Sequence, residues 1–435
     1  MRTLPAGLLT TLLGSHRVYC YAQVWGPPRL GTYNQGVGYT PQPILYMRIN
    51  DGSITMDATS TTRTTGSCTL SEWGTQDIQF QPTSPPIIPD TAKAPLTPFG
   101  NQIVFYWGAE GFPPQTFGPY CLTAVTTKVD AESGTTEIDV EFADLSAYIA
   151  QAKFPRQMVI PDGTTLPALV REMLGAVLPD IKTTLVADLG SPGSPGTPGT
   201  PTAYGDDPSG WPTSTGETFR EGMDAWKTVS NIVDAFGFQL YFDQASIPHL
   251  CRVPIIAGAP VFAVSSASGT ISALTKEFTR KNVYNHWIAL CEGSVILTAS
   301  GLKHPLKAKV PFSEDAADVN PGSPFAVNSA FGDVPMVYHD RLSATPPAAF
   351  LAAAQQLVRS LGKAEVLTVS HPPVPGVDAY DAWLVACHEA RIVANPYIVD
   401  GWTFPLRFDT LMTTNLHRAY QFTPPTGPYS TKLVF

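Results

Sequence analysis

Residues 283–291, VYNHWIALC, place bulky side chains on both faces of a predicted β-strand. Apolar and aromatic residues alternate with the period of two that is typical of a strand. One face carries Asn285 and Trp287, and the other carries Tyr284 and Ile288. A strand that is apolar on both faces is covered on both faces, which favours the inside of a sandwich or barrel, or a contact between subunits. We therefore predict Tyr284, Asn285 and Trp287 as core or interface residues.

The composition favours short strands joined by many turns. Charged residues make up 14% of the 435 residues, whereas there are 42 prolines and 35 glycines. Such a chain is β-rich rather than a bundle of long helices. Its length exceeds what one hydrophobic core usually supports, so we expect two to four domains.

Charge and cysteine usage exclude several classes of function. The net charge is −9, and no cluster of Lys and Arg with interleaved aromatic residues offers a local nucleic-acid site. The cysteines are far apart, with neither a C-x-x-C pair nor the Cys/His spacing of a zinc site. We expect six buried free thiols in a protein that folds in a reducing cytosol: Cys20, Cys68, Cys121, Cys251, Cys291 and Cys387.

The N-terminus resembles a signal peptide without having its full pattern. Thr10 and Thr11 interrupt the short apolar run, and no A-x-A cleavage site follows. We expect instead a short amphipathic helix that ends at Gly14. No window reaches the roughly 18 apolar residues of a membrane span, so none is predicted.

Residues 1–148 are expected to form one barrel-like β domain. Its predicted strands include a hairpin of residues 122–129 and 137–142 around a turn at 132–134. The other predicted strands are residues 17–25, 54–58, 66–70, 78–81 and 102–107.

Residues 149–261 are expected to form a small α/β domain. A predicted helix follows Thr165 as its N-cap, and a second begins after Asp224, stops at Gly237 and leads into a strand at 238–242. Between the helices lies a Gly/Pro-rich tract at 190–210, which has nothing apolar to bury and is expected to be an extended loop. It is either a surface finger that touches a partner or a tolerated insertion.

Residues 262–435 are expected to form a second barrel-like β domain with one helix. Thr345 and Pro346 would open this helix and Gly362 would end it. Strands are predicted at 365–370, 383–387 and 397–404. The predicted fold class is thus β-rich α+β, with two barrel-like β domains flanking the α/β domain.

A search for catalytic motifs finds none. The sequence has no phosphate-binding glycine loop and no G-x-S-x-G nucleophile elbow. His388 and Glu389 begin like H-E-x-x-H, but Ile392 occupies the place of the second ligand, so a zincin site is absent. No catalytic, cofactor-binding or metal-binding residue is predicted, and the protein is not expected to be an enzyme.

Three acidic residues alternate along one predicted strand. Glu137, Asp139 and Glu141 share a face, and their spacing places neighbouring carboxylates about 7 Å apart. Glycoside hydrolases use carboxylate pairs at such distances, but they draw the pair from different strands or loops. We therefore expect a solvated or channel-facing acidic surface.

Six segments occur in an order that resembles the minor tail proteins of actinobacterial siphophages. They are MRTLPAGLLTTLLGSHRVYCYAQVW, DGSITMDATSTTRTTGSCTL, TPFGNQIVFYWG, FTRKNVYNHWIAL, FGDVPMVYHD and AAAQQLVRSLGKAEVLTVSHPP. Those proteins are similar to the tail-hub family, which includes the central hub of contractile-phage baseplates. The tract at 190–210 departs from this pattern, so the resemblance implies no role for it.

The resemblance implies a homotrimeric ring at the tail tip of the virion, assembled in the host cytoplasm. Each subunit would supply two related barrels, and three subunits would present a near-sixfold surface to the tail tube. The expected partners are the distal tail protein, other tail-tip proteins and the tape-measure protein, with DNA met only in transit. The alternative is a carbohydrate-binding or carbohydrate-cleaving receptor-recognition protein of the tail tip.

Overall fold

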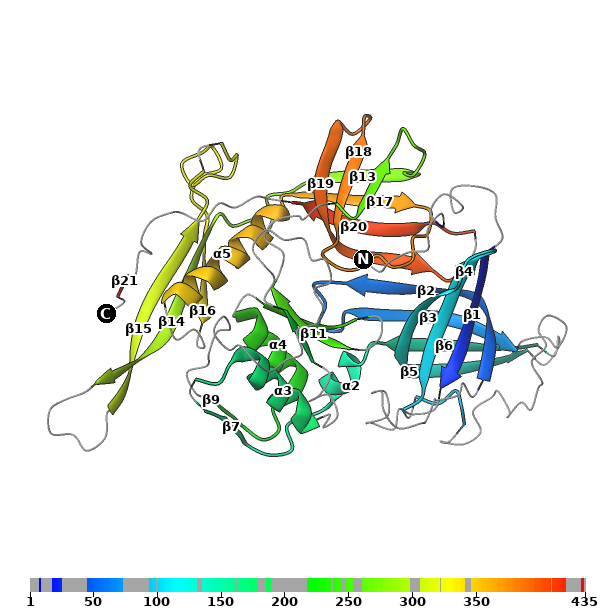
Figure 1. The fold of residues 1–435 in the computed structure, drawn as a ribbon, viewed down its shortest axis with the longest axis horizontal. Helices are drawn as coiled ribbons and strands as arrows, with labels where there is room; N and C mark the ends of the chain where they lie inside the picture. Colours follow the sequence, from blue (N-terminus) through cyan, green and yellow to red (C-terminus); the bar gives the residue numbers. More distant parts are fainter. Residues whose placement is uncertain are drawn as a thin grey trace.

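Strands dominate the protein (Figure 1). The computed structural model describes the following residues: 8, 18–25, 45–72, 94–98, 100–130, 135–161, 163–177, 185–188, 217–235, 238–243, 247–252, 260–297, 306–320, 322–340, 346–407, 409–419 and 432–433. The tract at 190–210 and the predicted strand at 78–81 lie outside them, as does the predicted N-terminal helix apart from Leu8.

Six N-terminal strands pair in a closed cycle. They are β1 (Val18–Trp25), β2 (Leu45–Asp57), β3 (Thr64–Glu72), β4 (Gln102–Ala109), β5 (Gln115–Asp130) and β6 (Thr135–Ala143). The order is β1-β4-β5-β6-β3-β2, all antiparallel, and β2 pairs again with β1. The predicted hairpin is confirmed as β5 and β6, with Lys128 opposite Glu137.

Six later strands extend the same sheet. They are β12 (Phe262–Ser265), β13 (Ala273–Phe278), β17 (Glu365–His371), β18 (Ala382–Cys387), β19 (Ile392–Pro405) and β20 (Met412–Arg418). The order continues β2-β19-β20-β17-β13, while β18 pairs with β19 and β12 pairs in parallel with β18. Gly401 lies at the junction with β2, where a Cβ atom would come within 2.5 Å of the Met56 carbonyl oxygen. Because a side chain would collide with that carbonyl, glycine permits the close approach of the two strands.

Both sets of strands share one hydrophobic core. Phe404 of β19 is fully buried, and its ring centroid lies 5.4 Å from that of Trp107 and 4.6 Å from that of Phe117. Residues nearly 300 positions apart in sequence therefore pack as neighbours. Large buried aromatic rings of this kind contribute much of a core's stability.

An α/β unit with its own core lies beside the first strands (Figure 1). Its elements are α2 (Ser146–Gln151), β7 (Met158–Ile160), α3 (Leu166–Val177), β8 (Val186–Asp188), β9 (Glu217–Phe219), α4 (Ala225–Ala235), β10 (Phe238–Phe242) and β11 (Pro248–Arg252). Both predicted helices are confirmed. The Asp224 Oδ1 accepts a hydrogen bond from the Lys227 amide at 2.8 Å, which caps α4 as the sequence predicted.

A third core forms between β13 and β17 in the chain. It is built from β14 (His286–Leu297), β15 (Leu306–Ala317), β16 (Pro335–Asp340) and α5 (Pro346–Gly362). The C-terminal strand β21 (Lys432–Leu433) pairs with β15. The strand order is β16-β14-β15-β21, and α5 packs against β14 and β15 (Figure 1). The sequence grouped these elements with β17 to β20, but here they bury their apolar side chains in a separate cluster. The domain boundaries at 148 and 261 stay predictions.

Within a single chain, only one face of residues 283–291 is largely buried. Val283, Asn285, Ala289 and Cys291 are buried, and Trp287 on the same face is half-buried and packs against the third core. The alternate residues are also half-buried. The strand also begins later than predicted, at His286. The Tyr284 amide donates to the Ser360 Oγ at 2.6 Å instead of joining a strand ladder. A subunit contact on the half-buried face stays a prediction.

Candidate functional site

The predicted acidic residues lie on the outer face of β6. Glu137 and Glu141 are exposed and Asp139 is half-buried, while Ile138 and Val140 between them point into the core. The Asp139 carboxylate is 2.5 Å from the Lys128 Nζ and accepts a hydrogen bond from the Thr69 hydroxyl at 2.7 Å. These hydrogen bonds hold the pKa of Asp139 below its usual range. The three carboxylates line a strand and do not converge on one point.

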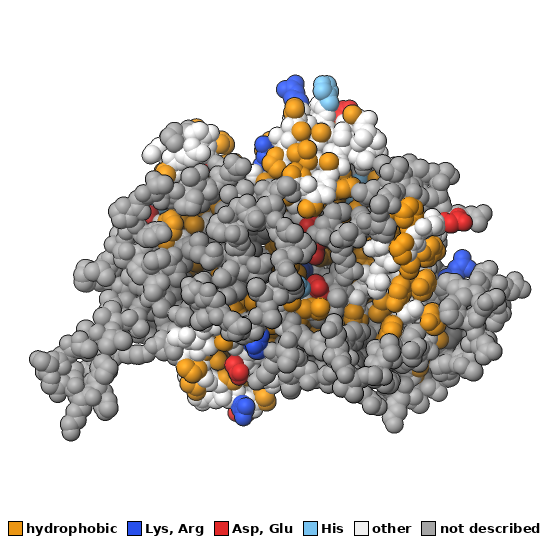
Figure 2. Space-filling model, viewed as in Figure 1, with side chains coloured by type: hydrophobic (Ala, Val, Ile, Leu, Met, Phe, Trp, Pro, Cys, Tyr) orange, Lys and Arg blue, Asp and Glu red, His pale blue; other side chains and the backbone are white. Residues whose placement is uncertain are grey.

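A tyrosine cluster covers the outer face of β1, β2 and β4. Tyr21 stacks on Tyr106 with ring centroids 4.9 Å apart and planes 7° from parallel, and both are half-buried. Tyr19 and Tyr46 extend this cluster, and each of the four rings keeps part of its surface exposed. Figure 2 shows hydrophobic side chains, tyrosine included, gathered over these strands. Tyrosine is enriched at protein interfaces, so the cluster is a candidate contact surface that sequence periodicity did not single out.

Asn285 holds together the loops that surround β14. Its side-chain nitrogen donates to the carbonyl oxygens of Phe325 and Gly332, both at 2.7 Å, and its side-chain oxygen accepts from the Val334 amide at 2.8 Å. The residue is fully buried. The structure thus places Asn285 in the third core.

Tyr284 and Trp287 border a cavity of about 420 Å³. Their rings meet edge to face, with centroids 5.8 Å apart. Arg359 and Lys363 of α5 and its C-terminal turn line the same cavity, together with Asp400 and His417 from the large sheet. The cavity therefore lies where the third core meets that sheet. On the sheet side, the His417 Nδ1 and an Asp400 carboxylate oxygen lie 2.7 Å apart.

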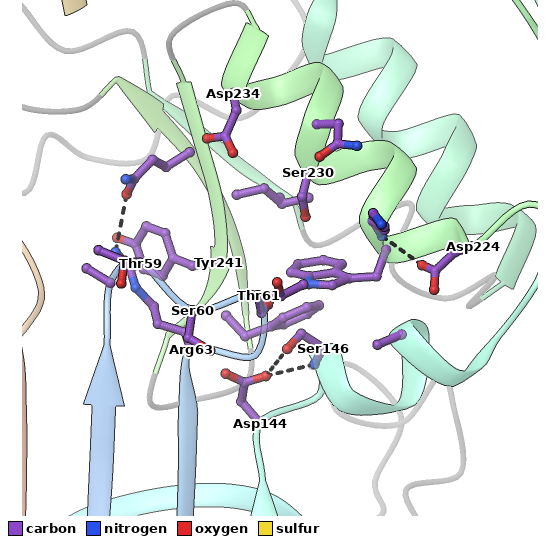
Figure 3. Close-up of a pocket in the computed structure, with 18 residues that line it drawn as sticks. Thr59, Ser60, Thr61, Arg63, Asp144, Ser146, Asp224, Ser230, Asp234 and Tyr241 are labelled. Atoms are coloured by element: carbon purple, nitrogen blue, oxygen red, sulfur yellow. Dashed lines mark hydrogen bonds between the residues drawn. The ribbon is translucent and has the colours of Figure 1, made fainter. Parts of the chain in front are cut away.

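A second cavity, of about 380 Å³, lies where the turn between β2 and β3 meets α4 and β10 (Figure 3). It shares Ala58, Thr59, Asp234 and Gln239 with the first cavity. The Trp226 Nε1 donates to the Thr61 carbonyl at 2.6 Å and ties α4 to the turn. The two cavities together follow the junction of the sheet, the α/β unit and the third core. No sequence pattern indicated this junction.

The described residues include few groups suited to metal binding or nucleophilic catalysis. No group of three or more potential metal ligands occurs among them. Burial raises the pKa of the thiols of Cys20, Cys68 and Cys121, so these side chains are protonated and inert at neutral pH. Over the same residues, no helix is long and apolar enough to span a bilayer.

Comparison by sequence gives no relative: no family model matches the chain, and no curated protein matches it. Comparison of the structure with solved structures gives clear matches. The tail protein from Neisseria meningitidis MC58 superposes with a TM-score of 0.56 over 92% of this chain and 96% of its own, at 12% identity. The chain has the fold of this tail protein.

A second tail protein gives the same result. The 43 kDa tail protein of prophage MuSo2 from Shewanella oneidensis matches with a TM-score of 0.51 at 10% identity, over 92% of this chain and 98% of its own. Both matches run over nearly the full length of each partner. The tail-protein fold therefore includes the α/β unit and the third core as well as the large sheet.

Proposed function

We propose that the protein is a structural hub of a phage tail tip, forming a homotrimeric ring that joins the tail tube to the tip and surrounds the channel for DNA and the tape-measure protein. The observation that carries the proposal is the tail-protein fold, shared over 92% of the chain. The order of sequence segments that resembles minor tail proteins of actinobacterial siphophages supports the same proposal.

Two features of the large sheet support a ring built from paired halves. The closed cycle of β1 to β6 is what one barrel requires. The strands β12, β13 and β17 to β20 form a second set that is fused to the first through β2 and β19. We propose that these two sets are the two related barrels. Three copies would then present six such sets to the tail tube.

The tyrosine cluster is the described surface whose chemistry best fits a subunit contact. Tyr21 and Tyr106 offer apolar area with polar tips, a combination that interfaces favour. We assign the outer face of β6, with Glu137, Asp139 and Glu141, to the channel wall. Carboxylates there would repel the phosphates of passing DNA and prevent it from sticking.

The proposed role is not enzymatic. The carboxylates of β6 do not face one another across a cleft, and neither of the two cavities described above includes them. A glycoside-cleaving tail protein would need such a pair around a bound sugar. We propose that its partners in the virion include the distal tail protein and other tail-tip proteins.

The oligomeric mass of the purified chain tests the proposal. We expect about three times 46.7 kDa by light scattering, with contacts burying well over ~2,000 Å² each, as obligate interfaces do. Replacing Tyr21 and Tyr106 together by Glu should shift the population toward monomer. Arg156→Glu, an exposed charge change in the α/β unit, is the matched control. A stable monomer in native virions would contradict the proposal.

A further inference from the structure

Arg63 is a charged side chain buried at the junction of the molecule. It follows the turn between β2 and β3, and only 6% of its surface is exposed. Its guanidinium carbon lies 3.9 Å from the centre of the Tyr241 ring and 5.1 Å from that of Tyr380. One terminal nitrogen donates to the Gln239 Oε1 at 3.2 Å. Figure 3 shows Arg63 and Tyr241 together at the cavity of about 380 Å³.

The hydrogen bonds of this guanidinium are incomplete. An arginine side chain has five N–H donors and stays protonated in proteins. The Nε and the second terminal nitrogen of Arg63 are buried and have no acceptor in the described part of the chain. The two tyrosine rings stabilise the positive charge, but they give no oxygen to these donors. A buried donor without an acceptor lowers the stability of the folded protein. An added acceptor group at this site would therefore stabilise it.

The carboxylates that line the same cavity are already engaged elsewhere. Asp144 accepts hydrogen bonds from the amides of Thr64 at 2.7 Å and Ser146 at 2.9 Å. Asp224 caps α4 and lies 3.6 Å from the Lys153 Nζ.

The third carboxylate is engaged as well. Asp234 lies 3.7 Å from a terminal nitrogen of Arg359, on the side of the neighbouring cavity. Arg63 forms no ion pair with any carboxylate among the described residues. Asp144 and Asp378 act on the Arg63 charge at longer range, but neither accepts a hydrogen bond from it. The cavity thus contains a guanidinium with no anion in direct contact.

We propose that this cavity is a binding site for a small oxyanion, of the carboxylate or phosphate type, held by Arg63. Its volume of about 380 Å³ accommodates such an ion with several waters. A planar guanidinium presents parallel N–H groups that fit two oxygens of one anion. The hydroxyl groups of Ser60, Thr61 and Ser230 line the same space and can donate to further oxygens.

Binding would connect parts of the chain that are distant in sequence. Arg63 comes from the large sheet, Tyr241 from β10 of the α/β unit, and Tyr380 from the segment that precedes β18. An anion that completes the hydrogen bonds of Arg63 binds only the folded junction, so it should raise thermal stability in a saturable manner. This inference is independent of the proposed hub role, because it rests on the hydrogen bonding of one side chain.

Thermal unfolding of the full chain tests the proposal, with sodium phosphate and sodium malonate as probes and sodium chloride at equal ionic strength as baseline. We expect a saturable rise in Tm with at least one probe. A larger rise with phosphate would indicate a phosphate-type site, and a larger rise with malonate would indicate a carboxylate-type site. Arg63→Met keeps much of the side-chain volume and should weaken the apparent affinity at least tenfold. Arg280→Met is the matched control, since Arg280 also lies over a ring, 4.6 Å from the centre of Phe331, but is exposed.

An equal rise in Tm for the unaltered chain and Arg63→Met would overturn the proposal. The proposal would also fail if phosphate and malonate raised the Tm of the unaltered chain no more than sodium chloride does. If Arg63→Met does not fold, crystals of the unaltered chain grown with sodium selenate decide the question. We expect an anomalous peak within hydrogen-bond distance of the Arg63 guanidinium. Ordered water alone at this position would refute an anion site.

Discussion

The side-chain oxygen of Asn285 accepts a hydrogen bond from the amide of Val334, 2.8 Å away and 49 residues later in the chain. The same side chain donates to two further carbonyl oxygens, so one buried amide satisfies three backbone groups of the loops around β14. A side chain used in this way fixes the path of a loop that has few regular hydrogen bonds of its own.

Asn285→Ala should therefore lower the free energy of unfolding by about 3 kcal/mol, because three half-buried backbone groups lose their partners. Urea unfolding measures this change. Asn231→Ala, at an exposed position of α4, is the control and should change stability by less than about 0.5 kcal/mol. A small effect of Asn285→Ala would mean that water replaces the side chain at these groups.

The two tryptophans Trp383 and Trp287 should differ in their importance for stability. Trp383 is fully buried and packs edge to face on Phe262 and His371. Trp287 borders a cavity and is half-buried. We expect Trp383→Ala to cost about 3–5 kcal/mol and Trp287→Ala clearly less, about 2 kcal/mol in the isolated chain. Equal costs, measured by urea unfolding, would show that a contact between subunits covers Trp287 in solution.

Acid should weaken the fold through His371. Its Nδ1 lies 2.7 Å from the Pro372 carbonyl oxygen and its Nε2 lies 2.8 Å from the Thr414 hydroxyl. Burial lowers the pKa of His371 to about 4. The unfolded chain has a histidine pKa of about 6.5, so between these values only the unfolded state takes up the proton.

The contribution of His371 to the free energy of unfolding is thus fully present above a pH of about 6.5. It decreases as the pH is lowered toward 4, by about 2 kcal/mol at pH 5. The test compares urea unfolding of the unaltered chain and His371→Gln at several pH values. The variant should show a flatter dependence on pH in this window. Parallel curves would assign the acid sensitivity to other groups.

The thiols should react slowly in the native protein. All six cysteines are free, and five of them are buried. Burial raises the pKa of Cys121 to about 12, so its thiolate is rare at neutral pH. Iodoacetamide labelling followed by mass spectrometry should modify Cys251, which is half-buried, before the others. After denaturation all six should react, and rapid native labelling of Cys121 would contradict its burial.

The acidic residues of β6 should matter for function more than for folding. The substitutions Glu137→Gln, Asp139→Asn and Glu141→Gln, made together, should change the free energy of unfolding by less than about 1 kcal/mol, since exposed ion pairs contribute little. In virions they should slow DNA ejection at low salt, and the defect should shrink as salt screens the charges. Glu110→Gln, an exposed position on another turn, is the control. An assembly with these side chains on its outer surface would end the channel assignment.

Local elements could be predicted because their signals lie within a few residues of one another. Asp224 precedes the apolar positions of α4 and caps it, and α5 runs from Pro346 to Gly362 as the sequence indicated. The hairpin of β5 and β6 followed from alternation on either side of a short turn. In each case the hydrogen bonds that define the element join residues close in sequence, and residue types near its ends specify where it starts and stops.

Sequence patterns alone predicted α3, α4 and α5, about half of the strands and the order of segments that resembles tail proteins, but not α2. Three features depend on the three-dimensional arrangement of the chain: β2 pairs with β19, β14 to β16 form a separate core with α5, and Arg63 contacts Gln239, 176 residues later. These contacts depend on which apolar faces bury one another after distant segments meet. Many pairings satisfy the same alternation of residues, so no local pattern specifies which of them forms.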